Sequence, residues 1–156
     1  MSKNWHEFTR PVALCLFTNN GRLLAAKGTD SVKQTEFYRP IGGMIEFGEY
    51  GADALSREVM EETGQKIKNI KYVGTLENIF TYEGKSGHEI ILMYDAEFEN
   101  KSVYEQECID IVEVDWCKAY WLSIEDCING KLTIYPNGIL ELLAKGGNWS
   151  NQGNIR

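Results

Sequence analysis

The chain has 156 residues, of which 43% are hydrophobic and 25% are charged, and its formal net charge is −7. This length suits one domain with a continuous core, and the composition excludes a disordered or collagen-like chain. The acidic balance argues against binding of long nucleic acid, because proteins that bind a phosphate backbone carry clustered Lys and Arg.

The start of the chain, residues 1–7, lacks the apolar core of a signal peptide. No stretch of the sequence approaches the roughly 20 apolar residues of a membrane span. We therefore expect a cytoplasmic protein that does not engage a membrane. Two histidines and four cysteines without a C-x-x-C pair give little support for zinc, so reduced thiols are expected at Cys15, Cys108, Cys117 and Cys127.

The N-terminal third reads as strands separated by glycine-containing turns. Residues 10–17 are apolar and rich in strand formers, residues 19–21 (Asn-Asn-Gly) are a turn signal, and residues 22–27 follow as a second strand. This pattern predicts a hairpin. Residues 37–40 form a short extended piece, and Ile-Gly-Gly at 41–43 is expected to break regular structure.

A helix is predicted over residues 51–63, where apolar and charged side chains recur at helical spacing and Gly64 stands just past the end as a C-cap. Strands are then predicted over residues 70–80, 88–98 and, less clearly, 111–121. A turn at residues 83–87 joins the first two of these strands.

The C-terminal part contains two further helix signals. Ser123 has the position of an N-cap with acids in the following turn, and the short helix after it ends at Asn129-Gly130. A last helix is predicted from Pro136 through Leu143. The polar, glycine-rich end suggests one domain over residues 1–145 and a flexible tail over 146–156.

Strands lie both before and after the first helix, which predicts an α/β (α+β) sandwich around a mixed β-sheet and not a regular βαβ alternation. The sequence contains neither the G-x-G-x-x-G of a dinucleotide-binding turn nor the G-x-x-x-x-G-K-[ST] of a P-loop.

Three carboxylates share one face of the predicted helix, because Glu58, Glu61 and Glu62 are three and four residues apart. Like charges at this spacing repel one another, and a bound divalent cation would offset the repulsion. A site of several carboxylates without histidine or thiolate favours Mg²⁺, with Mn²⁺ as a substitute. The same cation would let an acidic protein bind a phosphorylated substrate.

Two further features flank these acids. Gly42 and Gly43 precede the helix, where the absence of side chains lets the backbone approach an ion and present carbonyl oxygens, unless they form a mere turn. Arg57 lies four residues before Glu61 and can also meet Glu49 in the preceding loop. Such a guanidinium would fix the loop against the helix.

With these residues in view, the segment is similar to the signature of the Nudix hydrolase family, G-x5-E-x7-R-E-U-x-E-E-x-G-U, where U is bulky and aliphatic. The last aliphatic position is occupied by Gln65, and the proline that commonly precedes the double glycine lies one place early, at Pro40. The matching positions are Gly43, Glu49, Arg57, Glu58, Val59, Glu61, Glu62 and Gly64.

The resemblance implies a Nudix-type α/β/α sandwich and metal-assisted attack of water on phosphorus, which splits a nucleoside diphosphate linked to another moiety. It implies Glu58 and Glu62 as main metal ligands, Glu61 as a further ligand or base, and the Gly43 carbonyl as a backbone ligand. Glu58 and Glu61 thereby become the catalytic candidates of the helix.

Candidates outside the signature rest on weaker patterns. Arg39 is a candidate for a phosphate and His88 for a substrate contact, each against a plain structural or surface role. Glu105 and Glu107 lie in a polar segment after a strand, where a general base is expected, against an ordinary acidic loop.

The functional alternative is a Nudix-fold module that binds a nucleotide or nucleotide sugar without cleaving it, and a third reading is a diphosphate isomerase on the same fold. The complete R-E-x-x-E-E favours the hydrolase, and no cysteine and glutamate pair for an isomerase can be placed. The expected partner is a small nucleoside diphosphate compound whose identity the sequence does not specify. Both a monomer and a homodimer stay open.

Overall fold

The computed structural model of the chain describes residues 7–112 and 117–146. Its helices are α1 (Gly51–Thr63), the 3-10 helix η1 (Lys101–Glu105), α2 (Ile124–Ile128) and α3 (Ile139–Gly146). Its strands are β1 (Thr9–Cys15), β2 (Thr18–Asn19), β3 (Arg22–Asp30), β4 (Thr35–Met44), β5 (Ile67–Tyr82), β6 (Lys85–Phe98), β7 (Cys108–Asp110) and β8 (Lys118–Ser123).

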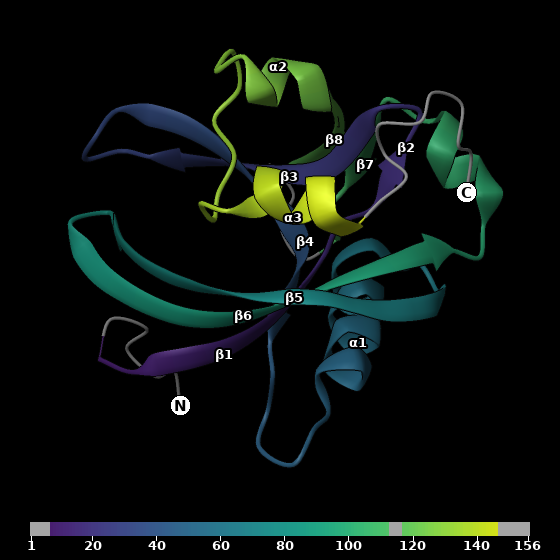
Figure 1. Cartoon of the computed structure of the whole chain (residues 1–156), viewed down its shortest axis with the longest axis horizontal. Helices are drawn as coiled ribbons and strands as arrows, with labels where there is room; N and C mark the ends of the chain where they lie inside the picture. The colour runs from purple at the N-terminus through teal and green to yellow at the C-terminus, as the bar shows by residue number, and fades with distance from the viewer. Residues whose placement is uncertain (1–6, 113–116, 147–156) are drawn as a thin grey trace.

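The strands form a mixed sheet of order β5-β6-β1-β4-β3-β8-β7, and β2 pairs with β3. Strands β1 and β6 run parallel, whereas the neighbouring pairs β1–β4, β3–β4, β3–β8 and β5–β6 are antiparallel. The N-terminal part of β4 pairs with β3 and its C-terminal part with β1, so β4 joins two halves of the sheet, as Figure 1 shows. This architecture confirms the predicted mixed α+β sandwich.

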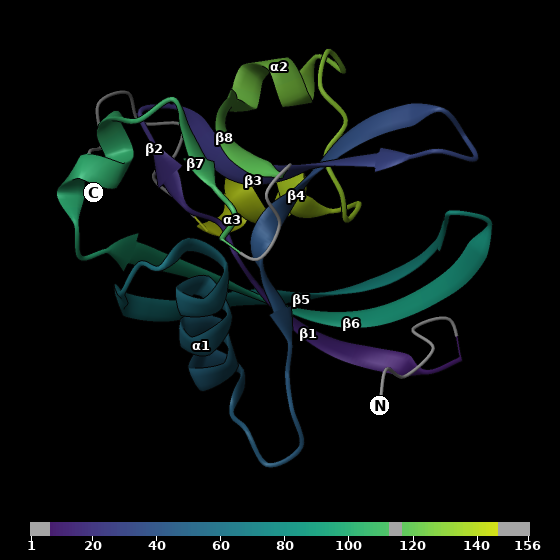
Figure 2. The same cartoon turned by 180° about the vertical axis from the view of Figure 1, so that it is seen from behind.

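Strand β1 lies at the centre of the core because it is buried on both faces. Ala13 and Cys15 point into a cluster that includes Leu55 and Val59 of α1. Val12 and Leu14, on the other face, belong to a cluster with side chains of β6 and α3. Burial on both faces explains the continuous apolar run of this strand. Helices α1 and α3 therefore lie on opposite sides of β1 (Figures 1 and 2).

Helix α1 is confirmed with the predicted bounds. Gly64 ends it in the left-handed conformation at φ 71°, and the Gly64 N–H donates to the Met60 carbonyl at 2.8 Å. This is the backbone conformation that favours glycine after a helix. The signal for α1 is local in sequence, which is why its bounds were predictable.

The predicted hairpin of residues 10–17 with 22–27 is wrong in its pairing. The turn at Asn20 and Gly21 forms, with both φ angles positive, but it joins the short β2 to β3. Strand β1 instead pairs with β4 and β6, because a strand buried on both faces takes a central place in the sheet.

The predicted break at residues 41–43 is also wrong, since Gly42 and Gly43 continue β4 opposite Leu14 and Ala13 of β1. A Cβ atom on Gly42 would lie 2.0 Å from the Ala13 carbonyl oxygen, which is closer than atoms can approach. The glycine here permits close pairing of two strands and does not interrupt one.

Later elements differ from prediction at their ends. The strand expected over residues 111–121 is replaced by β7 and β8, and residues 113–116 lie outside the described part of the chain. The turn expected at 83–87 is a two-residue turn at Glu83 and Gly84, because β6 already begins at Lys85. Ser123 caps α2 as predicted by accepting from the Asp126 N–H.

The last helix begins at Ile139 and not at Pro136, since Gly138 has a φ of 99°, which a helix does not accommodate. The predicted tail falls largely on residues 147–156, outside the described residues. None of the helices within residues 7–112 and 117–146 has the length and apolarity needed to cross a bilayer.

Candidate active site

The candidate site lies where the C-terminal end of β4 meets α1. Gly43 faces Glu58 across this junction, and a Cβ atom on Gly43 would lie 2.3 Å from the Glu58 carboxyl carbon. Only glycine therefore leaves room for the Glu58 carboxylate against the β4 backbone. The predicted partners Gly43 and Glu58 are brought together by this close approach.

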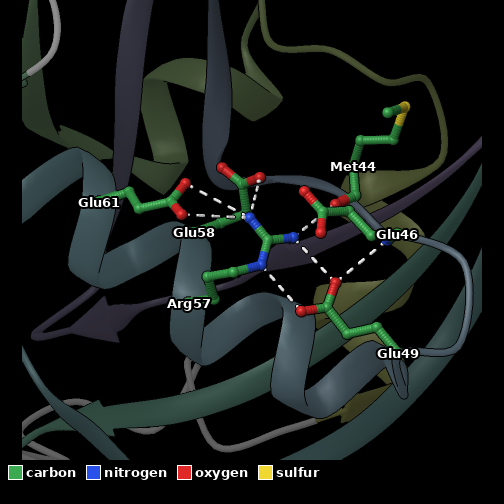
Figure 3. Close-up of polar contacts among 6 residues, drawn as sticks. All are labelled: Met44, Glu46, Glu49, Arg57, Glu58 and Glu61. Atoms are coloured by element: carbon green, nitrogen blue, oxygen red, sulfur yellow. Dashed lines mark hydrogen bonds and ion pairs between the residues drawn. The ribbon is translucent and has the colours of Figure 1, made fainter.

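Arg57 is the centre of the polar network in Figure 3. Its Nε and Nη2 donate to the two carboxylate oxygens of Glu49 at 2.8 Å each, which is a bidentate pair. Its Nη2 also donates to the Met44 carbonyl at 3.0 Å. Arg57 thus ties the loop between β4 and α1 to the helix, as the sequence predicts.

The same guanidinium compensates the acids of the helix. Arg57 Nη1 donates to Glu58 Oε1 at 2.9 Å and lies 3.3 Å from Glu61 Oε2. The repulsion expected between these carboxylates is therefore partly offset by the protein itself. The sequence predicts a bound cation as compensation and Arg57 as a bridge between acids, and the structure contains the second of these.

The network shifts the protonation equilibria of its members. The hydrogen bonds from Arg57, followed by the Glu46 N–H, lower the pKa of Glu49 to about 2. The hydrogen bond to Glu49 is also the largest cause that raises the pKa of Arg57, against an opposing effect of burial. Glu49 and Arg57 are both charged across the physiological range, so their pairing persists there.

Glu62 lies at the C-terminal end of α1, beside the segment that precedes β8. The Val112 N–H donates to the Glu62 carbonyl at 2.7 Å. Burial raises the pKa of the Cys117 thiol, and the nearby Glu62 charge adds to this effect. These contacts place the backbone around residues 112 and 117 next to the last turn of α1.

The donor chemistry of this site fits a hard divalent cation. The Glu58 carboxylate lies against the Gly43 backbone, and Glu61 and Glu62 follow within one turn of the same helix. In the described residues, no three carboxylate, histidine or cysteine side chains already converge as a finished cation site. Two of the carboxylates, Glu58 and Glu61, instead contact Arg57, so a cation bound here would compete with that pairing.

The two candidate bases outside the signature lie on the segment that joins β6 to β7. Glu105 is the last residue of η1, so this segment is partly helical and not the plain loop predicted, and Glu107 follows it. Both are exposed. Their assignment as a general base stays a prediction.

His88 and Arg39 lie in different surroundings. His88 Nε2 pairs with Glu77 at 2.9 Å, and His88 Nδ1 pairs with Thr9 at 3.2 Å. Because both ring nitrogens have partners within the protein, the geometry favours a structural role for His88 over a substrate contact. Arg39 donates to Glu89, which is buried at 1% exposure, and lines a cavity. The sequence analysis does not identify Glu89. This residue lies at the alternating positions of β6 that face inward, together with Ile91 and Met93.

The Glu49–Arg57 pair predicts a pH-dependent stability difference. Glu49→Gln is expected to lower the Tm at pH 7, and the gap to the parent should narrow as the pH falls from about 4.5 toward about 2. The sign follows because a carboxylate with a lowered folded-state pKa stabilises above its unfolded pKa and loses that contribution on protonation. Parallel thermal unfolding of both proteins between pH 7 and pH 3 measures the gap, and a constant gap would contradict the pairing.

Comparisons with known proteins agree with this geometry. The family model described as NUDIX domain matches residues 8–141. Two curated relatives, each named NAD-capped RNA hydrolase NudC, come from Pseudomonas syringae pv. syringae and Pseudomonas putida. They are 30% and 32% identical to this chain over 116 residues, which is 74% of the chain and 37% of each relative. The chain thus spans little more than a third of their length.

Solved structures show the same fold. The MutT NUDIX hydrolase from Burkholderia pseudomallei superposes with a TM-score of 0.64 at 18% identity, over 90% of this chain and 100% of that one. A MutT protein from Bacillus halodurans gives a TM-score of 0.61 at 18% identity, over 88% and 83% of the two chains. With the family match over residues 8–141 and the Arg57–Glu58–Glu61 arrangement on α1, the chain belongs to the Nudix hydrolase family.

Proposed function

We propose that the protein hydrolyses the diphosphate linkage of a nucleoside diphosphate joined to another moiety, with Mg²⁺ as cofactor and Mn²⁺ as a substitute. The observation that carries the proposal is the network of Arg57, which fixes Glu58 against Gly43 and holds the preceding loop through Glu49. A binding module would have no need of this complete arrangement of acids.

The proposed roles follow the positions of the side chains. Glu58 and Glu62 would hold the cation, with Glu61 as a further ligand or base and the Gly43 carbonyl as a backbone ligand. When bound, a divalent cation supplies Lewis acidity toward the phosphoryl oxygens and a lowered pKa for water. Arg57 and Glu49 position these ligands and do not touch the substrate.

The names of the relatives suggest where to look for the substrate. Those relatives are NAD-capped RNA hydrolases, so a dinucleotide such as NAD and its RNA-linked form come first in a substrate panel. The net charge of −7 favours the free dinucleotide over the RNA-linked form.

The test is a panel of NAD, NAD-capped RNA, ADP-ribose, nucleotide sugars, dinucleoside polyphosphates and nucleoside triphosphates with Mg²⁺ or Mn²⁺. Released phosphate is measured after coupling to a phosphatase, and the RNA is followed by loss of its cap. Turnover of at least one compound is expected. Turnover of none, together with measurable binding, would support the binding module instead.

The search for the general base gives a separate prediction. One of Glu105→Gln and Glu107→Gln is expected to lower kcat by about 10²-fold or more with little change in KM, the range for a positioned base. Steady-state kinetics at saturating Mg²⁺ measure both variants and the double variant. Parental rates in all three would exclude this segment and leave Glu61 as the candidate.

A further inference from the structure

The N-terminus of α1 is not capped by a side chain. Tyr50 occupies the N-cap position, and its side chain accepts no hydrogen bond there. The first N–H group that donates within the helix is that of Ala54, to the Tyr50 carbonyl at 2.9 Å. The N–H groups of Gly51, Ala52 and Asp53 precede it and have no acceptor in the helix itself. Among the residues that the structure describes, none accepts a hydrogen bond from these three groups.

A tyrosine hydroxyl lies beside these donors. A Cβ atom on Gly51 would lie 2.2 Å from the Tyr94 hydroxyl oxygen, so this oxygen occupies the place of a side chain at the first position of the helix. The Cα–Cβ bonds of a helix tilt toward its N-terminus, and the unpaired N–H groups point toward the same end. The Tyr94 hydroxyl and the N–H groups of the first turn therefore meet at one end of α1.

Tyr94 is fixed in place by packing. The residue is 7% exposed and belongs to the core cluster that includes Ala54 and Leu55 of α1. Its ring meets the Tyr72 ring edge to face at 6.1 Å between centroids. Within the described part of the chain, no group forms a hydrogen bond with the Tyr94 hydroxyl. Because a buried tyrosine usually has a partner for its hydroxyl, this free hydroxyl beside free N–H groups indicates a ligand.

The chemistry of these groups selects an anion. Burial is the main cause that raises the pKa of Tyr94 above its ordinary value, and Tyr72 adds to the effect. The phenol therefore keeps its proton at neutral pH and can donate it to a hydrogen bond. The N–H groups also donate, and the dipole of α1 favours negative charge at this end.

Two acids lie close to this end of α1. Glu49 forms a bidentate pair with Arg57, so its charge is matched within the protein. Asp53 is exposed in the first turn, and with the described residues it forms no ion pair. Its carboxylate is attracted by the same helix end and would weaken the binding of an anion there. Removal of this charge is therefore expected to strengthen anion binding.

This helix end is separate from the proposed cation ligands. Gly51 lies against Leu92 and Tyr94 of β6. Glu58 lies against Gly43 of β4. Seven residues of helix separate Gly51 from Glu58, which corresponds to about 10 Å along the helix axis. An anion at the N-terminus of α1 therefore needs no bound metal.

We propose that the N-terminus of α1 and the Tyr94 hydroxyl form a binding site for a phosphate group, either inorganic phosphate or the phosphate of a monoester. Its oxygens accept from the N–H groups of Gly51 and Ala52 and from the Tyr94 hydroxyl. A phosphate monoester keeps three oxygens for these three donors, whereas a carboxylate has two. The site does not depend on the proposed hydrolysis.

Amide chemical shifts of the isotopically labelled full chain, measured without metal, test the site. Inorganic phosphate, methyl phosphate and acetate are titrated separately at constant pH and ionic strength. The amide signals of Gly51, Ala52 and Asp53 are expected to shift together and to saturate with at least one phosphate compound. That compound should bind about tenfold or more tightly than acetate, as one further hydrogen bond to a charged group allows. The tighter of the two phosphate compounds identifies the source of the group.

Three variants test the contribution of each group. Tyr94→Phe should weaken phosphate binding about tenfold or more and keep the parental Tm without phosphate, because its hydroxyl has no partner to lose. Asp53→Asn should tighten phosphate binding. The matched control is Tyr50→Phe, which removes an exposed hydroxyl from the adjacent N-cap residue and should bind like the parent. Equal binding by the parent and Tyr94→Phe, or shifts that spare residues 51–53, would overturn the proposal.

Arg39 offers phosphate a rival position. Its side chain is 37% exposed and lines a cavity between the hairpins β3–β4 and β5–β6. Arg39→Gln should keep the shifts of residues 51–53 and the parental affinity for phosphate. Loss of phosphate binding in Arg39→Gln, with binding kept in Tyr94→Phe, would place the phosphate in the cavity and refute the site on α1. Since no arm of the experiment uses metal or turnover, its result is independent of the substrate panel.

Discussion

Glu58→Gln and Glu62→Gln are each expected to lower kcat more than about 10²-fold at saturating Mg²⁺. Substitution of a group that only orients a metal ligand typically costs 10- to 100-fold, so loss of a charged ligand should cost more. Steady-state kinetics against the best substrate of the panel, with a full Mg²⁺ titration, measure the effect. A rate within tenfold of the parent in both variants would refute their assignment as ligands.

The folded state of these variants provides the control. From the sequence, each substitution should hold or raise the Tm in the absence of metal, because it relieves repulsion on the helix. That expectation stands for Glu62→Gln. For Glu58→Gln the 2.9 Å contact with Arg57 loses its charge and keeps at most a neutral acceptor, so the Tm should hold or fall slightly. Glu141→Gln, an exposed acid of α3, should leave both kcat and Tm unchanged.

Arg57→Ala is expected to lower activity and stability together. The variant loses the bidentate pair with Glu49, the contacts with Glu58 and Glu61, and the bond to the Met44 carbonyl. Loss of charged hydrogen bonds in a partly buried network costs about 1–3 kcal/mol, which lowers the Tm of a domain of this size by several degrees. Activity should fall about 10- to 100-fold, because the ligands lose their orientation.

Thermal unfolding and kinetics on the same preparation test this prediction. Arg57→Lys should be intermediate, since an ammonium group keeps the charge but lacks the planar fork that grips Glu49. Lost activity with an unchanged Tm would refute the bracing role and point to direct contact of Arg57 with the substrate.

The sequence predicted best what depends on neighbours along the chain. Helix α1, its Gly64 cap and the Arg57–Glu49 pair all lie within residues 49–64, so spacing alone brings their groups together. The family resemblance adds the proposed roles of Glu58 and Glu62 but not their geometry. The contact of Arg57 with Glu58, for which a bound cation would compete, could not be predicted from spacing, because adjacent residues of a helix do not face each other.

What the sequence could not predict depends on pairing between distant segments. Strand β1 has the composition of a hairpin arm, yet it pairs with β6, almost 80 residues away in the register Arg10↔Glu89. That register brings Arg10 to Glu89, and both side chains line the cavity. No local pattern in the sequence predicts such a pairing. Glu89 does alternate with the apolar core-facing residues of the β6 sequence, and this position indicates a buried acid.

Strand β4 carries Arg39 and Gly43 on one continuous backbone, four residues apart. Four residues of extended chain span at most about 14 Å, so β4 sets the distance between Arg39, which lines the cavity, and the proposed cation ligand Gly43. The cavity and the proposed cation site therefore lie at a separation that the backbone of β4 fixes. Insertion of one residue into this strand would turn every later side chain to the opposite face. This distance therefore cannot be changed one residue at a time without disrupting the sheet, whereas the hairpin tips can change in length.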